Sequence, residues 1–316
     1  MALNNLHTNW VLGSYQQDRD DEIKKSENAP LHATTKGLPG ASLSGLRPLH
    51  DGANSIAIGY GFDLLVRNNA EINTYLTAVG LGSLSAADSS LLNEARTRRS
   101  AGTATPTYLK GIATQLGLDL ISETNATKLL DEYITNRAEI DVDTFLSNNG
   151  LTMSPSRERA ALVSLAYNSP ALLGPGLATA LKDGNRAEAW YQIRYQSNGN
   201  ALGGLANRRY RESAMFGFYD NETSPIKEEA VQIYQMYTKH SPEMIAYDKN
   251  YGGLSSLSQS LYAAAKTIET EYLTPKNLSL GFINPLNIQI SYDGKLNLTG
   301  EDGTTHTGHI DDLLIG

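Results

Sequence analysis

The stretch Asn54-Ser55-Ile56-Ala57-Ile58-Gly59-Tyr60-Gly61-Phe62-Asp63-Leu64 decides the fold of this chain. Its alternating pattern up to Ile58 predicts a strand, and two glycines then let the backbone turn with positive φ. The strand before the glycines holds the side chain that follows them, Asp63, in a fixed place. We interpret the stretch as a tight corner built around a carboxylate, with an ordinary β-hairpin as the plain alternative.

A second carboxylate precedes this corner. The polar stretch 20–30 predicts a helix in which Ile23 faces a core and which ends at Pro30, so that Glu27 falls in the last turn. The negative end of the helix dipole favours the protonated form of a carboxyl group there, and if the group is also partly buried the burial favours the same form. Glu27 is therefore a candidate general acid, and a solvated charge on a polar helix is the alternative.

Four blocks of this chain, in this order, resemble the phage-type lysozymes, and within them the pesticin-like branch of bacterial toxins and secreted muramidases. The family pattern is a helix ending in Glu, a variable loop, and a strand that turns through Gly-x-Gly into Asp-Leu. Residues 23–27 and 55–64 match these parts. Residues 157–168 resemble the buried central helix, and residues 204–216 resemble the closing helix.

The resemblance implies an α+β, predominantly helical fold of the lysozyme type, with a small β-containing lobe, a larger helical lobe and a cleft between them. We predict a catalytic domain over residues 1–222 and a C-terminal extension over 223–316. Residues 28–55 are expected to form a long loop. Helical patterns are predicted over 70–79, 85–98, 107–116, 122–149, 154–168, 172–182, 186–195 and 205–219.

The activity implied by the resemblance is hydrolysis of the β-1,4 bond between N-acetylmuramic acid and N-acetylglucosamine in peptidoglycan glycan strands, without a cofactor or metal. This chemistry needs an acid and an ionised partner carboxylate. Glu27 is the predicted acid, and Asp63 is the favoured partner because it follows Gly-x-Gly. Asp51 is the second candidate, since it lies six residues before Ala57 as in the phage enzymes, but Asp51-Gly52 is also typical of a plain turn.

Ala57 departs from the family pattern, because most relatives carry a Thr there whose hydroxyl is thought to position the attacking water. Ser55 lies two residues earlier on the same strand face and can replace that hydroxyl if the strand is regular. Otherwise the enzyme is slow, follows a different stereochemical course, or only binds glycan. A weak glycan-binding or adhesin module and a toxin-delivery domain are thus the rival functions.

Three further side chains are candidates for substrate binding. Tyr60 lies in the turn itself, and Asn168 ends the predicted central helix, where it reaches a cleft or caps a neighbour. By resemblance, Arg208 pairs with Glu27. Arg209 and Arg211 are expected to be solvated charges, and Tyr167 to pack in the core.

Composition limits the partners and the route of export. A net charge of −8 argues against nucleic acid as the main partner, and zero cysteines exclude disulfides. No apolar run is long enough to span a membrane, and residues 1–12 lack the pattern of a Sec signal peptide. Since the predicted substrate lies outside the cell, we expect secretion by another route.

The C-terminal extension has a different character. Residues 225–240 and 254–273 have helical spacing, and 286–298 alternate around an Asp-Gly turn, which predicts a hairpin. Residues 309–316 resemble the opening of a calcium-binding RTX repeat array, which implies attachment to a longer RTX-type polypeptide exported by a type I system. His306 and His309 have a spacing compatible with metal ligands, but loop histidines are the favoured interpretation.

Overall fold

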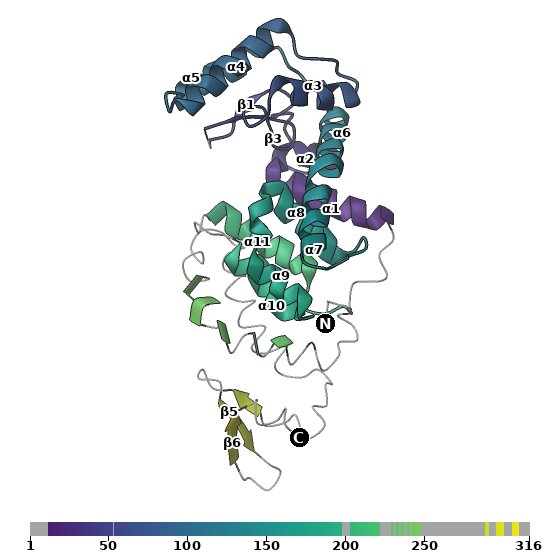
Figure 1. Cartoon of the computed structure of the whole chain (residues 1–316), viewed down its shortest axis with the longest axis vertical. Coiled ribbons are helices and arrows are strands. Elements are labelled where there is room, and N and C mark those ends of the chain that lie inside the picture. The colour runs from purple at the N-terminus through teal and green to yellow at the C-terminus, as the bar shows by residue number, and fades with distance from the viewer. Residues whose placement is uncertain are drawn as a thin grey trace. The chain divides into compact units, whose positions relative to one another are not determined.

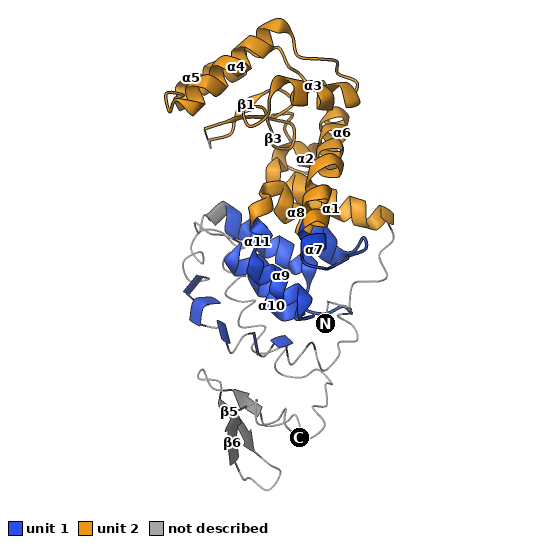
Figure 2. Cartoon of the chain, in the orientation of Figure 1, with its two compact units in different colours: residues 1–10, 145–161, 172–316 blue, residues 11–144, 162–171 orange. Residues whose placement is uncertain are grey.

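The structure is a computed structural model that describes residues 12–52, 54–197 and 203–221, separate positions between 229 and 247, and the backbone of three short C-terminal strands. The chain divides into two compact units (Figure 2). Unit 2 comprises Val11–Thr144 and Leu162–Ala171, and unit 1 comprises Met1–Trp10, Phe145–Ala161 and Leu172–Gly316. The domain boundary expected after residue 222 stays a prediction.

Unit 2 combines helices with a small antiparallel sheet (Figure 1). Its helices are α1 (Leu12–Glu27), α2 (Ala29–Lys36), α3 (Asn69–Ala78), α4 (Ala86–Ser100), α5 (Pro106–Gln115) and α6 (Glu123–Tyr133). A π-helical turn, Ile134–Ala138, continues α6 into α7 (Glu139–Asn148), which contributes residues to both units. The three strands, in the order β1-β2-β3, are β1 (Leu49–His50), β2 (Ile56–Ile58) and β3 (Phe62–Asp63).

Helix α1 packs one narrow face into the core. Its buried residues, Tyr15, Arg19, Glu22 and Ile23, recur at helical spacing, and Ile23 is fully buried as predicted. The prediction that Pro30 ends this helix was wrong. Pro30 lies in the first turn of α2, where its missing N–H is not needed, so residues 29–36 of the expected loop are helical.

The two faces of the sheet carry different residues. Ala57 pairs with Asp63 and Ile58 with Phe62, which leaves Gly59-Tyr60-Gly61 as a three-residue hairpin loop. Ile56, Ile58 and Phe62 are buried in the core, each at most 2% exposed. Ser55, Ala57 and Asp63 therefore share the opposite face.

Unit 1 is helical around a polar and apolar core. It contains α9 (Pro175–Lys182), α10 (Arg186–Tyr191), a π-helical turn Gln192–Gln196 and α11 (Gly203–Phe216). Helix α8 (Arg157–Asn168) contributes residues to both units, and its stretch 160–166 is buried throughout, as predicted for a central helix. Its first turn is capped by Ser156, whose hydroxyl accepts from the Arg159 amide.

The C-terminal strands form a second antiparallel sheet in the order β4-β5-β6 (Ile288–Ile290, Lys295–Thr299 and Thr305–His309). The pairing of Ile290 with Leu296 confirms the predicted hairpin, while β6 was not predicted. The described positions between 229 and 247 are helical. The helix expected at 254–273 and the RTX-like residues 310–316 lie outside the described residues.

These elements confirm the predicted fold class, an α+β and predominantly helical fold with a small antiparallel sheet. Each helical segment predicted between residues 70 and 219 contains a helix of the structure. In the described part of the chain, no helix has the length and apolar character needed to cross a membrane.

Candidate active site on the Gly-Tyr-Gly hairpin

Asp63 is fixed through one of its two carboxylate oxygens. Oδ1 accepts hydrogen bonds from the Ser55 hydroxyl at 2.5 Å, from the Leu65 amide at 2.7 Å and from the Val66 amide at 3.1 Å. No hydrogen bond from a described residue reaches Oδ2. Three donors converging on one oxygen suit an ionised carboxylate, which accepts and does not donate, and Asp63 is half-buried.

Glu27 lies against the same hairpin. It is the last residue of α1, and a Cβ built on Gly61 would lie only 2.6 Å from its Oε2 and 3.2 Å from its Cδ. The Glu27 carboxylate therefore occupies the space that any side chain at position 61 would need. Gly61 has φ of +82°, which glycine adopts without strain. The two predicted carboxylates are thus both tied to residues 61–63.

The hairpin turn is held by side chains from elsewhere in unit 2. Asn28 donates its side-chain amide to the Gly59 carbonyl at 3.1 Å and to the Ser44 carbonyl at 3.0 Å. The Tyr167 hydroxyl donates to the Tyr60 carbonyl at 2.5 Å. Because the Gly59 and Tyr60 carbonyls are bonded to other segments, the turn and Asp63 form a fixed platform.

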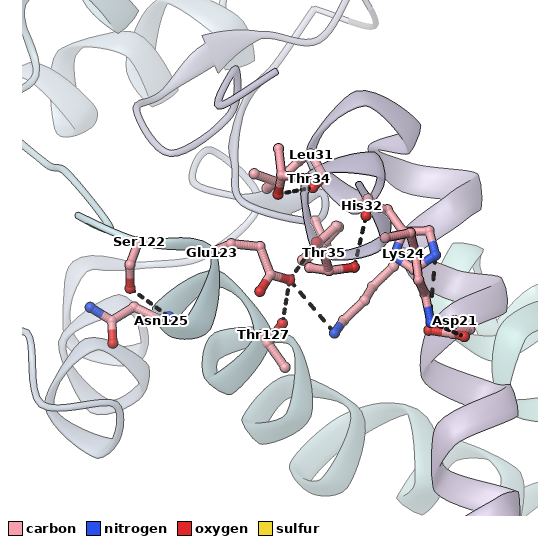
Figure 3. A network of polar contacts seen from close by, with 12 residues as sticks. Asp21, Lys24, Leu31, His32, Thr34, Thr35, Ser122, Glu123, Asn125 and Thr127 are labelled. Atoms are coloured by element: carbon pink, nitrogen blue, oxygen red, sulfur yellow. Dashed lines mark hydrogen bonds and ion pairs between the residues drawn. The ribbon is translucent and has the colours of Figure 1, made fainter. Parts of the chain in front are cut away.

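The Tyr60 side chain points into a polar network in the core. Its hydroxyl donates to Glu123 Oε1 at 2.7 Å, and burial and this hydrogen bond raise its pKa well above the usual value. The same Glu123 oxygen accepts from Thr127 at 2.7 Å and lies 3.7 Å from Lys24 Nζ (Figure 3). Glu123 therefore joins α1, α6 and the turn.

Two arginines support strand β3 from beneath. Arg67 donates to the Asp63 carbonyl at 2.6 Å, and its guanidinium lies 4.2 Å from the Phe62 ring centroid and 4.3 Å from that of Tyr133. Arg96 donates to the Leu64 carbonyl at 2.9 Å. Burial lowers the pKa of Arg96, and the negative charge of Asp63 opposes that shift. These cations fix the backbone carbonyls of Asp63 and Leu64.

The predicted site residues differ in where the structure places them. Glu27, Asp63 and Ser55 come together on the hairpin. Ser55 and Tyr60 are only 1% and 2% exposed, with their hydroxyls bonded to carboxylates, so a supporting role suits them better than the predicted direct contact with substrate. Asn168 is exposed at the end of α8.

Asp51 lies in a different setting from Asp63. It is exposed, its Oδ1 accepts from the Ser55 amide at 3.1 Å, and its own amide donates to the Ser55 carbonyl at 3.3 Å. These local bonds close the loop between β1 and β2. They match the plain-turn alternative for Asp51-Gly52.

Arg208 is buried in α11, where its Nε donates to Glu212 Oε1 at 3.0 Å. Its predicted approach to Glu27 stays a prediction. The expectation that Arg209 is solvated was wrong. Arg209 is fully buried and pairs with Glu212 Oε2, because α11 turns this face toward the core of unit 1.

Sequence reasoning missed the residues that hold the turn. Asn28 had a readable signal, since Asn followed by Ala-Pro is typical of a helix start, and the structure confirms it as the N-cap of α2. Tyr167 was assigned to the core, yet it is half-buried and binds the turn. Glu123 had no signal beyond its place in the first turn of a capped helix.

The arrangement provides two carboxylates beside one hairpin. Among the described residues, no group of three or more His, Cys, Asp or Glu side chains is placed to hold a metal ion. The chemistry available to the two carboxylates is acid and base catalysis at a bond that approaches the hairpin.

Comparison with known families agrees with this class of chemistry. Residues 92–212 match the family model described as phage lysozyme. The match supports placing the chain in the phage-type lysozyme superfamily, and it supports a peptidoglycan hydrolase in general terms. No curated protein and no solved structure matched the chain. The matched segment runs from α4 to α11 and does not reach Glu27 or Asp63, so the roles of these two residues rest on the hairpin geometry.

Proposed function

We propose that the protein is a muramidase that cleaves the β-1,4 bond between N-acetylmuramic acid and N-acetylglucosamine in peptidoglycan. The observation that carries the proposal is the placement of Glu27 against Gly61, two residues from the anchored Asp63. Glycoside hydrolysis needs one carboxylic acid and one carboxylate at the scissile bond. The family match supports the substrate class.

In the proposed mechanism Glu27 protonates the leaving glycosidic oxygen. Asp63 uses Oδ2, the oxygen without a hydrogen bond from a described residue, to stabilise the positive charge that develops at the sugar ring or to direct water. Ser55 and the amides of Leu65 and Val66 hold Oδ1, so the carboxylate does not need to reorganise during the reaction. Ser55 is therefore a positioning residue for Asp63.

The test compares release of dye-labelled fragments from purified peptidoglycan by the full chain and by Glu27→Gln. The amide has nearly the shape of the acid but cannot donate a catalytic proton, so we expect at least a 10³-fold loss of release. Glu94→Gln is the matched control, because Glu94 lies on the surface of α4 and pairs with Arg98. It should keep full activity.

Sedimentation with peptidoglycan sacculi separates the rival function. Glu27→Gln should still bind the sacculi, because the proposed loss is catalytic. If the parent binds without releasing fragments, the chain is a glycan-binding module and the proposal is wrong. The pesticin-like branch, the RTX attachment and secretion by a non-Sec route stay predictions.

A further inference from the structure

The side chain of Asn28 forms hydrogen bonds to three segments, which are the start of α2, the loop at Ser44 and the hairpin turn at Gly59. We call this place the junction. Its Oδ1 accepts from the Leu31 amide at 3.1 Å and caps α2. Its Nδ2 donates to the Ser44 carbonyl at 3.0 Å and to the Gly59 carbonyl at 3.1 Å. Only this orientation of the amide gives each group a partner of the right kind, because the two carbonyls cannot donate.

The junction is tightly built around this amide. A Cβ placed on Gly45 would lie 2.3 Å from Asn28 Nδ2 and 3.2 Å from the Gly59 carbonyl oxygen. Gly45 has φ of +95°, and its own carbonyl accepts from the Gly59 amide at 2.6 Å. The residue at position 45 must therefore lack a side chain for the Asn28 amide to reach the turn.

The place of Asn28 in the chain links this junction to the reaction. Asn28 directly follows Glu27, and Gly59 lies two residues before Gly61, against which the Glu27 carboxylate packs. Glu27 ends α1, so the helix alone does not fix its distance from β3. Asn28 binds Gly59, and its neighbour Glu27 packs against Gly61. The end of α1 is therefore attached to the hairpin at two nearby points.

We propose that Asn28 is a positioning residue that sets the distance between the Glu27 acid and the Asp63 carboxylate. This inference rests on the proposed function, since it assigns no chemistry of its own to Asn28. It predicts an effect on the rate of the chemical step, because a shift of about 1 Å in a catalytic group can cost about 10²-fold in rate. Substrate affinity should change little, since the amide is engaged within the protein.

The test uses Asn28→Asp and Asn28→Ser in the full chain, with kcat and KM measured on soluble peptidoglycan fragments. Both substitutions keep an N-cap oxygen for Leu31, but neither supplies the neutral amide donor to Gly59 and Ser44. We expect kcat to fall by about 10–100-fold in both variants, with KM within about threefold of the parent.

The pH profile distinguishes positioning from a general loss of structure. At low pH the carboxyl group introduced by Asn28→Asp is protonated and can donate to one of the two carbonyls, so its kcat relative to the parent should recover below about pH 4. Asn28→Ser has no titrating group and should show a constant ratio. Asn68→Asp is the control, because Asn68 caps α3 with Oδ1 and its amide nitrogen donates to no described residue.

The outcomes separate this inference from the proposed function. An inactive parent contradicts the proposed function itself. An active parent whose kcat is unchanged in both Asn28 variants overturns the positioning role, and so does a loss that appears equally in Asn68→Asp. Melting temperatures of all variants are recorded alongside, and a rate loss that merely follows unfolding also overturns it.

Discussion

Two polar regions of this molecule use their charges in opposite ways. On the hairpin of unit 2, the described residues anchor Asp63 through Oδ1, and Asp63 remains half-buried. In unit 1, the Arg186 cluster comprises Arg186, Glu158, Glu229 and Asp220. Arg186 and Glu158 are 1% and 0% exposed and pair at 2.6 Å, and Glu229 lies 3.5 Å from Arg186 Nε.

The difference between the two regions distinguishes a candidate catalytic group from charges that only stabilise the fold. The Arg186 cluster also binds the Phe216 carbonyl at 3.2 Å, so its groups face one another and the core. Such a cluster fixes helices α8, α10 and α11, and its Arg186–Glu158 pair is buried out of reach of a substrate. The hairpin instead fixes one carboxylate oxygen and keeps the other without a bond from a described residue. Polar groups held on one side only are the ones that can act on a ligand.

The largest expected effect concerns Asp63→Asn. The amide can still accept at Oδ1, so the hairpin should remain folded, but it cannot stabilise positive charge. We expect peptidoglycan hydrolysis to fall by about 10³-fold while the melting temperature changes by no more than a few degrees. Activity assays combined with thermal unfolding check this. Retained activity would move the partner role away from Asp63.

For Arg186→Met we expect a large loss of stability, in contrast to the small change of stability expected for Asp63→Asn. Removing the cation leaves Glu158 buried without its main partner, and breaking a buried pair in this way costs about 3–5 kcal/mol of unfolding free energy. Urea unfolding measures the loss. Arg98→Met, at an exposed pair with Glu94, should cost less than about 1 kcal/mol. Equal effects of the two substitutions would contradict the assignment of Arg186 to the core architecture.

Two half-buried carboxylates, Asp20 on α1 and Asp131 on α6, belong to neither of these two regions. Burial and the neighbouring Asp20 carboxylate raise the pKa of Asp131 from its usual 3.8 to about 6, and burial also raises the pKa of Asp20. The stability that the protonated pair provides is complete below about pH 3.8 and is lost as the pH rises through about 6.

Asp131→Asn removes this pH dependence, because the amide stays neutral. After allowance for solvent screening we expect a gain of about 1 kcal/mol in unfolding free energy at pH 7.5, which disappears near pH 4. Urea unfolding at both pH values measures it. Asp183→Asn, at an exposed position, should show no such difference between the two pH values. A constant gain at both would contradict the account.

The smallest effect is expected for Asp51→Asn. Asp51 closes a loop through its Oδ1 and its amide, and an asparagine offers the same two groups. Hydrolysis should therefore stay within about twofold of the parent. A loss comparable to that of Asp63→Asn would restore Asp51 as the partner carboxylate.

The sequence predicted the elements of the hairpin because its signals are local. Alternation of apolar residues, two glycines and the helix ending near Glu27 each follow from period and turn chemistry. The contacts that complete the site are long-range. Tyr167 reaches the turn across 107 residues and Asn28 across 31, and no periodicity encodes such pairs. Arg209 was misjudged for a different reason: its partner Glu212 lies only three residues away, but a pair of charges on one helix does not show which face of that helix is buried.

The most direct test of the central claim is mass spectrometry of the fragments that the full chain releases from purified peptidoglycan, with Glu27→Gln treated identically. The account predicts soluble muropeptides with N-acetylmuramic acid at the reducing end from the parent, and none above background from the variant. Reducing-end N-acetylglucosamine, free peptides, or equal release by both proteins would contradict a muramidase in which Glu27 is the acid.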